Sequence, residues 1–158
     1  MKFLKTIRFD PSDMHVFEHA AEQDEWAIPG SFWFSAIEEP ELNGKLKQAF
    51  SNGFLSLKSF GFSTFTSVAE ISQREVDVIT GNLAEKFVSG FGAPSIEEAL
   101  IAANQELEFV IEMCAEVPVN SIFAIRREFD EAGELKERLS LVQAPSEPVH
   151  TRVWEIVE

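Results

Sequence analysis

The chain has 158 residues, of which 45% are hydrophobic and 25% charged, a composition typical of one soluble globular domain with a sizeable core. Its formal net charge of −14 disfavours phosphate-bearing partners, so we expect it to bind neither nucleic acid nor an anionic membrane surface. The single cysteine, Cys114, excludes an internal disulfide and any multi-cysteine zinc site.

The first third of the chain is predicted to be mostly strand. In residues 2–9, "KFLKTIRF", Phe3, Ile7 and Phe9 share one parity, a strand pattern of period two that only Lys5 interrupts, and "DPSD" after them suits a type I turn. Residues 14–21, "MHVFEHAA", are expected to return as a second strand. Residues 26–28 and 32–34 flank a Pro-Gly pair that suits a type II turn with a positive φ at Gly30, and 32–34 should form the returning strand.

The middle of the chain is predicted to contain three helices and one long strand. Residues 41–52 have the pattern of a short helix that ends at an Asn-Gly pair, and 60–71 are rich in the residues that favour strands. "SQRE" and "SIEE" both match the capping box that begins a helix, and each precedes apolar residues at helical spacing. We therefore expect helices over about 73–91 and 95–116, packed as an antiparallel hairpin.

"SIFAIRREF" and "LKERLSLV" are predicted to form a β-hairpin. Pairing Asp130 with Glu134 leaves a three-residue loop that ends at Gly133, where a left-handed residue is needed. This register places Arg127 opposite Glu137, and their opposite charges favour it. The face so defined contains Phe123, Ile125, Arg127, Phe129, Leu135, Glu137, Leu139 and Leu141.

The order of these elements predicts an α+β fold. We expect an antiparallel sheet of about five to six strands, with the helical hairpin and the shorter helix packed on one face. Residues 1–143 should form one domain, and residues 144–158 are either a tail or a docked last strand.

Residue types that carry chemistry are few, and none forms a recognised catalytic motif. His15 and His19 are four residues apart; on a strand they would lie about 13 Å apart and could not share a metal ion. Cys114 continues the apolar stripe of its helix, and Glu112 and Glu116 beside it would disfavour a reactive thiolate. We therefore predict no catalytic residue, no metal site and no cofactor.

Aromatic residues give the clearest candidates for binding, because the stretch "EWAIPGSFWFS" holds two Trp and two Phe around one turn. These rings are either core or a rigid apolar groove or interface, and Trp33 is the first suspect for the latter. Ile101 stands on the polar face of the second long helix and could extend an apolar contact patch. The candidate binding residues are Trp26, Trp33, Phe34, Phe60, Phe62, Phe65, Ile101 and Trp154.

Three segments, "KFLKTIRFDPSD", "EWAIPGSFWF" and "NGFLSLKSFGFSTF", resemble a small family of bacterial proteins of unknown function. The resemblance covers most of the chain and is weakest beyond Gln143. The family has no established activity, cofactor or catalytic residue, so the resemblance implies no function.

We expect the protein to be a non-catalytic adaptor that binds a partner protein, or a second copy of itself as a homodimer, through an aromatic and apolar surface patch at the aromatic turn or the C-terminal tail. Its acidic surface would favour a basic patch on the partner. One alternative is a module that binds a small apolar ligand in a pocket lined by Trp33, Phe60, Phe62 and Phe65; another is an enzyme with unrecognised chemistry. No signal-peptide core and no apolar run of about 20 residues is present, so we expect a cytoplasmic protein.

Overall fold

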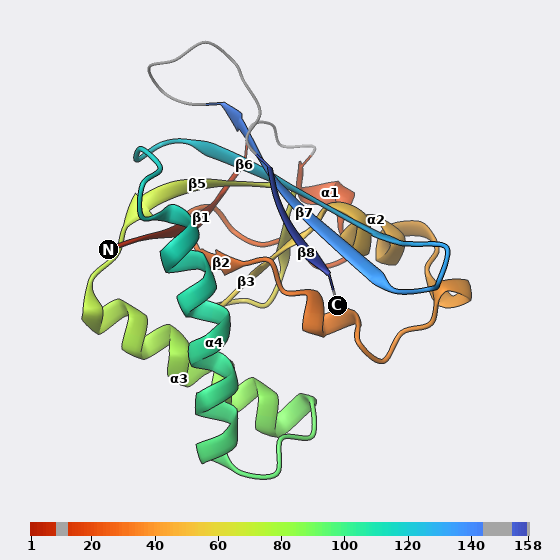
Figure 1. Cartoon of the computed structure of the whole chain (residues 1–158), viewed down its shortest axis with the longest axis horizontal. Coiled ribbons are helices and arrows are strands. Elements are labelled where there is room, and N and C mark those ends of the chain that lie inside the picture. The colour runs from red at the N-terminus through yellow and green to blue at the C-terminus, as the bar shows by residue number, and fades with distance from the viewer. Residues whose placement is uncertain (9–12, 144–152, 158) are drawn as a thin grey trace.

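A computed structural model describes residues 1–8, 13–143 and 153–157, and in these residues the fold is α+β (Figure 1). Eight strands form one sheet of order β4-β3-β2-β1-β5-β6-β7-β8, and every neighbouring pair is antiparallel. The strands are β1 (Lys2–Ile7), β2 (Trp26–Ile28), β3 (Phe54–Ser56), β4 (Phe62–Ser63), β5 (Phe65–Glu70), β6 (Ile122–Phe129), β7 (Leu135–Gln143) and β8 (Val153–Val157). The predicted five to six strands are too few, since β3 and β4 are short and buried and show no alternation.

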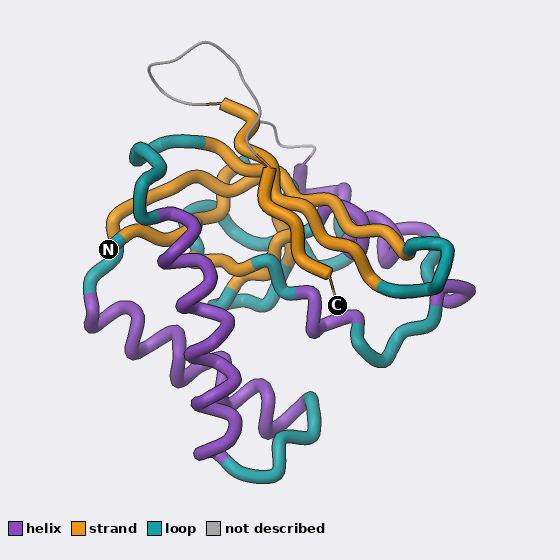
Figure 2. Tube along the Cα trace, viewed as in Figure 1, coloured by secondary structure: helices purple, strands orange, loops and turns teal. Residues whose placement is uncertain are grey.

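The helical hairpin is confirmed as helices α3 (Gln73–Gly90) and α4 (Ile96–Cys114), which pack against each other (Figure 2). Ser72 and Glu75 make the complete capping box at the start of α3. The hydroxyl of Ser95 accepts a hydrogen bond from the Glu98 amide at the start of α4. The hairpin packs on β1 and β2 through α4, whereas the shorter helix α2 (Gly44–Asn52) packs on β6.

Three local predictions in the first half of the chain are wrong. Residues 14–21 form no strand: a short helix α1 (Asp13–Val16) is followed by bends and by one parallel bridge between Ala20 and Phe62. Phe17 and Ala21 are the buried hydrophobic residues here, and their spacing of four would also place them on one face of a strand, but Phe17 begins the bends after α1 and Ala21 follows the bridge at Ala20. The predicted strand over 60–71 is divided into β4 and β5.

The predicted strand over residues 32–34 is also wrong, because Ser31–Phe34 is a 3₁₀-helix, here η1. Gly30 has the positive φ expected from the Pro-Gly turn, +80°, but the chain continues into a helical turn. The amides of Trp33 and Ser35 donate to the carbonyls of Gly30 and Phe32, at 3.1 Å each, which satisfies the turn locally. A second 3₁₀ turn at Glu39–Glu41 delays the start of α2 to Gly44, three residues later than expected.

The β6–β7 hairpin has the predicted register. The Asp130 amide donates to the Glu134 carbonyl at 2.9 Å, Gly133 has a φ of +80°, and Arg127 pairs with Glu137. Residues 153–157 form β8, which pairs with β7, so this part of the C-terminal segment is a docked strand; residues 144–152 lie outside the described residues.

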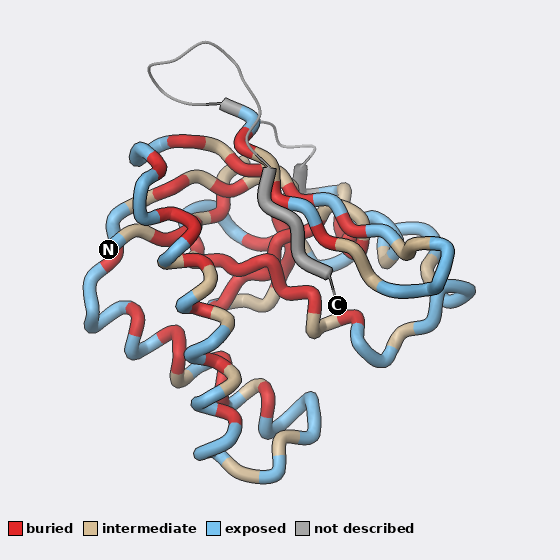
Figure 3. The backbone as a smooth tube through the Cα atoms, in the orientation of Figure 1, coloured by how far each residue is buried: buried red, intermediate tan, exposed pale blue. Residues whose placement is uncertain are grey.

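The core lies between the sheet and the helices, where buried residues form one connected cluster (Figure 3). Strand β1 is covered on both faces, because the adjacent residues Phe3 and Leu4 are both fully buried. Two charged residues of the hairpin, Arg127 and Glu137, belong to this buried interior. Their position determines the geometry of the segment that carries the aromatic candidates.

Candidate functional site

A buried ion pair anchors the start of η1 to the sheet. The side chains of Arg127 and Glu137 are 0% and 2% exposed, and Nε of Arg127 lies 2.9 Å from Oε1 of Glu137. The same Nε donates to the hydroxyl of Ser31 at 2.9 Å, and that hydroxyl donates to Glu137. Nη2 of Arg127 donates to the carbonyl of Pro29. The turn before η1 is therefore held by charged hydrogen bonds inside the core.

The same guanidinium binds the end of α2. Nη1 of Arg127 donates to the carbonyls of Phe50 and Gly53 at 2.9 Å each, and to that of Ala49 at 3.3 Å. Carbonyls at the end of a helix lack partners within the helix, and they carry the negative end of its dipole. One cation thus satisfies the end of α2 and fixes it relative to η1.

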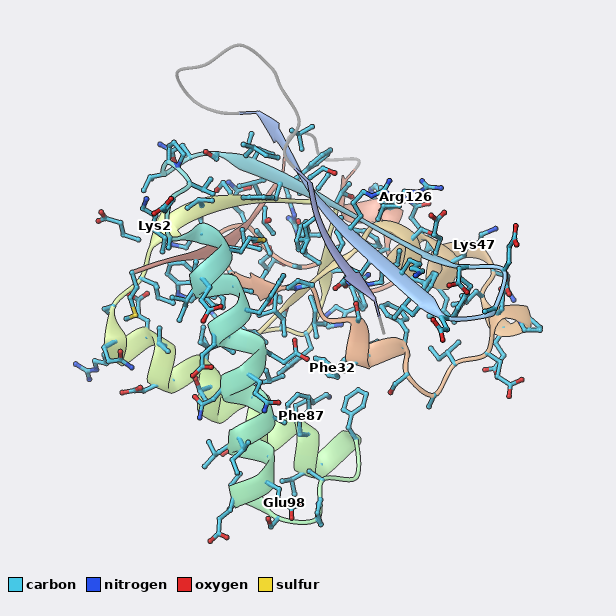
Figure 4. All side chains as sticks on the ribbon, in the orientation of Figure 1. Lys2, Phe32, Lys47, Phe87, Glu98 and Arg126 are labelled. Carbon is cyan, nitrogen blue, oxygen red and sulfur yellow. The ribbon has the colours of Figure 1, made fainter. Side chains whose placement is uncertain are left out.

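Next to Arg127, whose guanidinium lies 5.2 Å from the centroid of the Phe34 ring, seven aromatic rings form a group that we call the aromatic cluster. It contains Phe32, Trp33, Phe34, Phe60, Phe62, Phe87 and Phe91. Phe32 and Phe87 point toward each other, with ring centroids 4.8 Å apart (Figure 4). Trp33 stacks on Phe60 with centroids 6.2 Å apart and lies 5.2 Å from Phe91. These edge-to-face and stacked pairs are the favoured geometries of aromatic side chains.

The cluster has a buried side and an open side. Phe34 and Phe62 belong to the core, whereas Phe32, Trp33 and Phe60 are half-buried and Phe91 is 37% exposed. The amine of Lys86 lies 5.3 Å from the centroid of Trp33 and 5.2 Å from that of Phe60. The aromatic stretch of the sequence therefore supplies both core rings and surface rings.

The open side continues into the end of the helical hairpin, residues 88–101, which we call the hairpin tip. Its exposed apolar side chains are Val88, Phe91, Ile96, Leu100 and Ile101. Phe91 belongs to both groups, and it places the tip next to Trp33 and Phe32. Acidic residues are close to them in the chain: Glu97 and Glu98 within the tip and Glu85 just before it are all exposed.

The structure brings together four of the eight residues that the sequence singled out, namely Trp33, Phe34, Phe60 and Phe62. Ile101 lies on the hairpin tip and is 61% exposed. Phe65 is on β5, between Ile7 and Ala124 of the neighbouring strands, and is not a ring of the cluster. The backbone of Trp154 pairs with Leu139, and its side chain lies outside the described residues.

Trp26 belongs to a different site. Its ring contacts Phe3 edge to face at 6.1 Å, and the amine of Lys5 lies 4.5 Å from its centroid. Its indole Nε1 donates to Glu75 at 3.1 Å, which ties β2 to the start of α3. Beside it is a cavity of about 440 Å³ between the start of α3, the residues just before β2 and the loop that follows β3. The apolar ligand pocket predicted from Trp33, Phe60, Phe62 and Phe65 is not this cavity, which other residues line.

A buried carboxylate supports one wall of this cavity. Glu25 is 5% exposed and accepts hydrogen bonds from the Ser56 hydroxyl, from the Ser59 amide at 3.0 Å and from the Glu22 amide at 2.8 Å. Burial by itself raises the pKa of the Glu25 carboxyl, but these hydrogen bonds outweigh it and hold the pKa below the ordinary 4.5. Glu25 is therefore ionised at neutral pH, and its carboxylate accepts hydrogen bonds from three groups of the protein.

The other chemically interesting residues are not assembled into a reactive site. Burial raises the pKa of the Cys114 thiol to about 12, with a smaller opposing effect of Lys2, so the thiol is protonated at neutral pH. Burial, and not the adjacent Glu112 and Glu116 proposed from the sequence, is the main cause. His15 and His19 are exposed, and no group of His, Cys, Asp and Glu in the described chain is arranged to hold a metal ion.

Among the described residues, no helix has both the length and the apolar composition needed to cross a bilayer. Sequence reasoning did not single out Phe32, Phe87 and Phe91 of the aromatic cluster, or Lys86 beside it, as candidate binding residues. The signal for Phe91 was present: an aromatic residue follows the last turn of a helix, next to a helix-ending glycine, where a buried role is not expected.

Residues 1–153 match the model of a family described as a family of unknown function, DUF6505, and the chain belongs to that family. This agrees with the resemblance found in the sequence. No curated protein and no solved structure matches the chain.

Proposed function

We propose that the protein is a non-catalytic docking protein that binds a partner protein through the hairpin tip and the open side of the aromatic cluster. The observation that carries this proposal is the concentration of exposed apolar residues. Of nine large hydrophobic residues that are exposed in the described chain, five lie within residues 88–101. Apolar residues that gather at one place on a surface are typical of interaction sites, whereas scattered ones are ordinary.

The aromatic rings behind the tip suit the role of anchors. Phe32, Trp33 and Phe60 are already fixed by ring contacts, so a partner would lose little side-chain freedom on binding them. Aromatic residues also dominate the binding energy of protein interfaces. The half-buried rings would form the centre of the contact, and the hairpin tip would form one side of it.

The charges around the tip indicate the chemistry of the partner. Glu97 and Glu98 are exposed at the tip, Glu85 is exposed just before it, and the whole chain carries a net charge of −14. Lys86 is the basic residue beside the rings, and its amine already lies over Trp33 and Phe60. An apolar segment flanked by Lys or Arg would therefore be attracted and oriented, whereas a second copy of this acidic chain would be repelled.

The test compares the untagged wild type with the Phe91→Ser and Val119→Ser variants by native mass spectrometry. Each protein is purified from the cytoplasmic fraction of its own cells, the compartment expected from the sequence. Val119 is a matched control because it is as exposed as Phe91, 37%, but lies beyond the other end of α4. Circular dichroism of all three proteins verifies that they are folded.

We expect the wild type and the Val119 variant to retain a second protein in fixed stoichiometry, and raised ionic strength to release it. Loss of a central aromatic anchor should weaken this complex by about 2 kcal/mol or more, roughly 30-fold in Kd, so the Phe91 variant should lose the partner. A partner that the Phe91 variant retains would refute the docking surface. If the wild type is instead a homodimer and the Phe91 variant is a monomer, the partner at this surface is a second copy of the chain.

A further inference from the structure

The cavity beside Trp26 is separate from the aromatic cluster, and we propose that it binds a small zwitterion with an apolar body, such as an amino acid with an apolar side chain. This inference goes beyond the docking function and does not rest on it, because it concerns a different site and a different class of ligand. The cavity has a volume of about 440 Å³, within the range of about 300–1,000 Å³ that is usual for sites of small molecules.

The apolar part of the lining is already ordered. It consists of one ring and three aliphatic side chains, Trp26, Leu57, Val78 and Ile79. The indole packs edge to face with Phe3, and its Nε1 donates to Glu75 at 3.1 Å. Leu57 and Ile79 are buried, whereas Val78 is 55% exposed. An apolar body can therefore pack against this lining without the cost of ordering it first.

The charged part of the lining carries both signs. It holds three carboxylates, Asp24, Glu25 and Glu75, and two cations, Lys58 and Arg74. The amine of Lys5, which is not part of the lining, lies 4.5 Å from the centroid of Trp26 and is a third cation close by. The carboxylates keep their charge although neutral groups donate hydrogen bonds to them. A ligand with a net charge of either sign would therefore meet groups that repel it.

Both parts of the chain that form the cavity contribute opposite charges. The start of α3 contributes Arg74 and Glu75, which are consecutive in the chain. The loops contribute Asp24 and Glu25 together with Lys58, and these loops meet where Glu25 accepts a hydrogen bond from the amide of Ser59. In the part of the chain that the structure describes, the side chains of Asp24, Lys58 and Arg74 make no ion pair or hydrogen bond. Charges of both signs are thus available to a ligand.

This mixture of charges is the reason for the choice of a zwitterion. A ligand that fills the cavity displaces water from charged groups of both signs, and a charge that loses water without gaining a partner costs free energy. An anion would leave the carboxylates without a partner, a cation would leave Lys58 and Arg74 without one, and an uncharged molecule would compensate neither. A zwitterion brings an ammonium to the carboxylates and a carboxylate to Lys58 or Arg74.

The charged groups are attached to segments that the fold holds in place. Glu25 binds the Ser56 hydroxyl and the Ser59 amide, and it thereby holds the loop that carries Lys58. The capping box fixes the start of α3, which carries Arg74. A preformed site needs little ordering on binding, so even a small ligand can bind measurably.

The test uses three ligands that share one phenyl-ethyl body and differ in charge. Phenylalanine is a zwitterion, phenethylamine lacks its carboxylate, and 3-phenylpropanoate lacks its amine. Each ligand is titrated into isotope-labelled protein, and NMR follows the indole N–H resonance of Trp26. This resonance is assigned by its absence from the spectrum of Trp26→Phe.

The ligands are compared in the wild type, in a Lys58→Gln, Arg74→Gln variant and in Asp24→Asn. Asparagine preserves the shape of Asp24 and tolerates its φ of 62°. Lys45→Gln, Lys47→Gln is the control with the same net charge as the Lys58, Arg74 variant, because both lysines are exposed on α2 and neither lines the cavity. The backbone amide resonances verify that each variant is folded.

We expect phenylalanine to shift the Trp26 resonance with one site per chain, and to bind roughly fivefold more tightly than either of the other two ligands. Loss of Lys58 and Arg74 should weaken phenylalanine by about the same factor but should not weaken phenethylamine. Asp24→Asn should weaken phenylalanine less, because Glu25 and Glu75 remain, and should not weaken 3-phenylpropanoate.

Two proteins should bind phenylalanine as the wild type does, the Lys45, Lys47 control and the Phe91→Ser variant, so this test can fail while the docking proposal holds. The inference would be overturned if phenethylamine or 3-phenylpropanoate bound as tightly as phenylalanine, or if the Lys58, Arg74 variant retained the affinity of the wild type. It would also be overturned by a Trp26 resonance that does not shift, or by loss of phenylalanine binding in the Phe91 variant.

Discussion

Replacing Arg127 with methionine should destabilise the fold by about 3–5 kcal/mol, the range observed when one partner of a buried ion pair is removed. The reason is that Glu137, whose side chain is 2% exposed, would stay in the core without the counter-ion that Arg127 now supplies. Among the described residues, the hydroxyl of Ser31 also donates a hydrogen bond to Glu137. A loss of this size is a large part of the total stability of a domain, about 5–15 kcal/mol.

A second contribution comes from the carbonyls that the guanidinium now satisfies. Those of Pro29, Phe50 and Gly53 would lose a charged donor, and each buried polar group left unpaired costs about 1–3 kcal/mol. The variant Arg127→Lys separates the two contributions, because an ammonium keeps the charge beside Glu137 but cannot reach all these acceptors at once. We expect the free energy of unfolding of the lysine variant to lie between those of the wild type and the methionine variant.

The assay is urea unfolding, followed by tryptophan fluorescence and circular dichroism. With an m-value of about 2 kcal/mol per M, a loss of about 4 kcal/mol would lower the midpoint by about 2 M. The double variant Arg127→Met, Glu137→Leu removes both charges and should recover about 2 kcal/mol of the loss, which a double-mutant cycle measures as coupling. The reasoning would be refuted if the methionine variant lay within about 1 kcal/mol of the wild type, or if the two single losses simply added.

Three further predictions concern packing, a thiol and pH. Gly61→Ala should destabilise the protein by about 1–3 kcal/mol, because its Cβ would lie 2.7 Å from the backbone of Ala20. Gly81→Ala, in open space on α3, should stabilise the protein by about 0.5–1 kcal/mol. Urea midpoints equal to that of the wild type would contradict both expectations. The Cys114 thiol, with a pKa of about 12, should react with a disulfide reagent at neutral pH only after unfolding, and rapid labelling of the native protein would disprove its burial. The pKa of Glu25 is lowered in the folded state, so the ionised carboxylate stabilises the fold fully above its ordinary pKa of 4.5, and this stabilisation is lost as the pH falls through the pKa of the folded state. Urea midpoints should therefore fall less steeply on acidification in Glu25→Gln than in the wild type. Parallel curves of midpoint against pH would contradict this.

The helices and the β6–β7 hairpin could be predicted because their signals are local. Each long helix has a Ser-x-x-Glu start and apolar residues at one spacing, and both features act within a few residues. The hairpin register followed from loop length and from one matching charge pair, Arg127 with Glu137. The charge pair predicted which residues of the two strands lie opposite each other. It did not predict that both side chains are buried, because their burial depends on the residues of α2 and η1 that pack over them.

The remaining parts of the fold depend on contacts between distant segments. Strands β3 and β4 have three and two residues, too short to show a period, and all five residues are buried. The aromatic cluster joins residues from η1, from the segment around Phe60 and from the last turns of α3. Composition indicated that rings would pack, but their division into core and surface is set by this tertiary arrangement. For the same reason Trp26 and Trp33, close in sequence, belong to different sites.

The surroundings of Trp26 and the aromatic cluster share one rigid base, and this determines whether they can influence each other. Trp26 and Trp33 lie on either side of the turn at Pro29 and Gly30, which Arg127 holds by the Pro29 carbonyl. At Gly30 a Cβ would lie 2.5 Å from the Cβ of Leu55, so the turn has no room to move toward β3. Coupling between two sites requires an element with two arrangements that each ligand can bias. A turn packed and bonded in this way offers none, so binding of a partner at the aromatic cluster should leave the indole N–H resonance of Trp26 where it is in the free protein. A shift of that resonance on partner binding would mean that the turn moves.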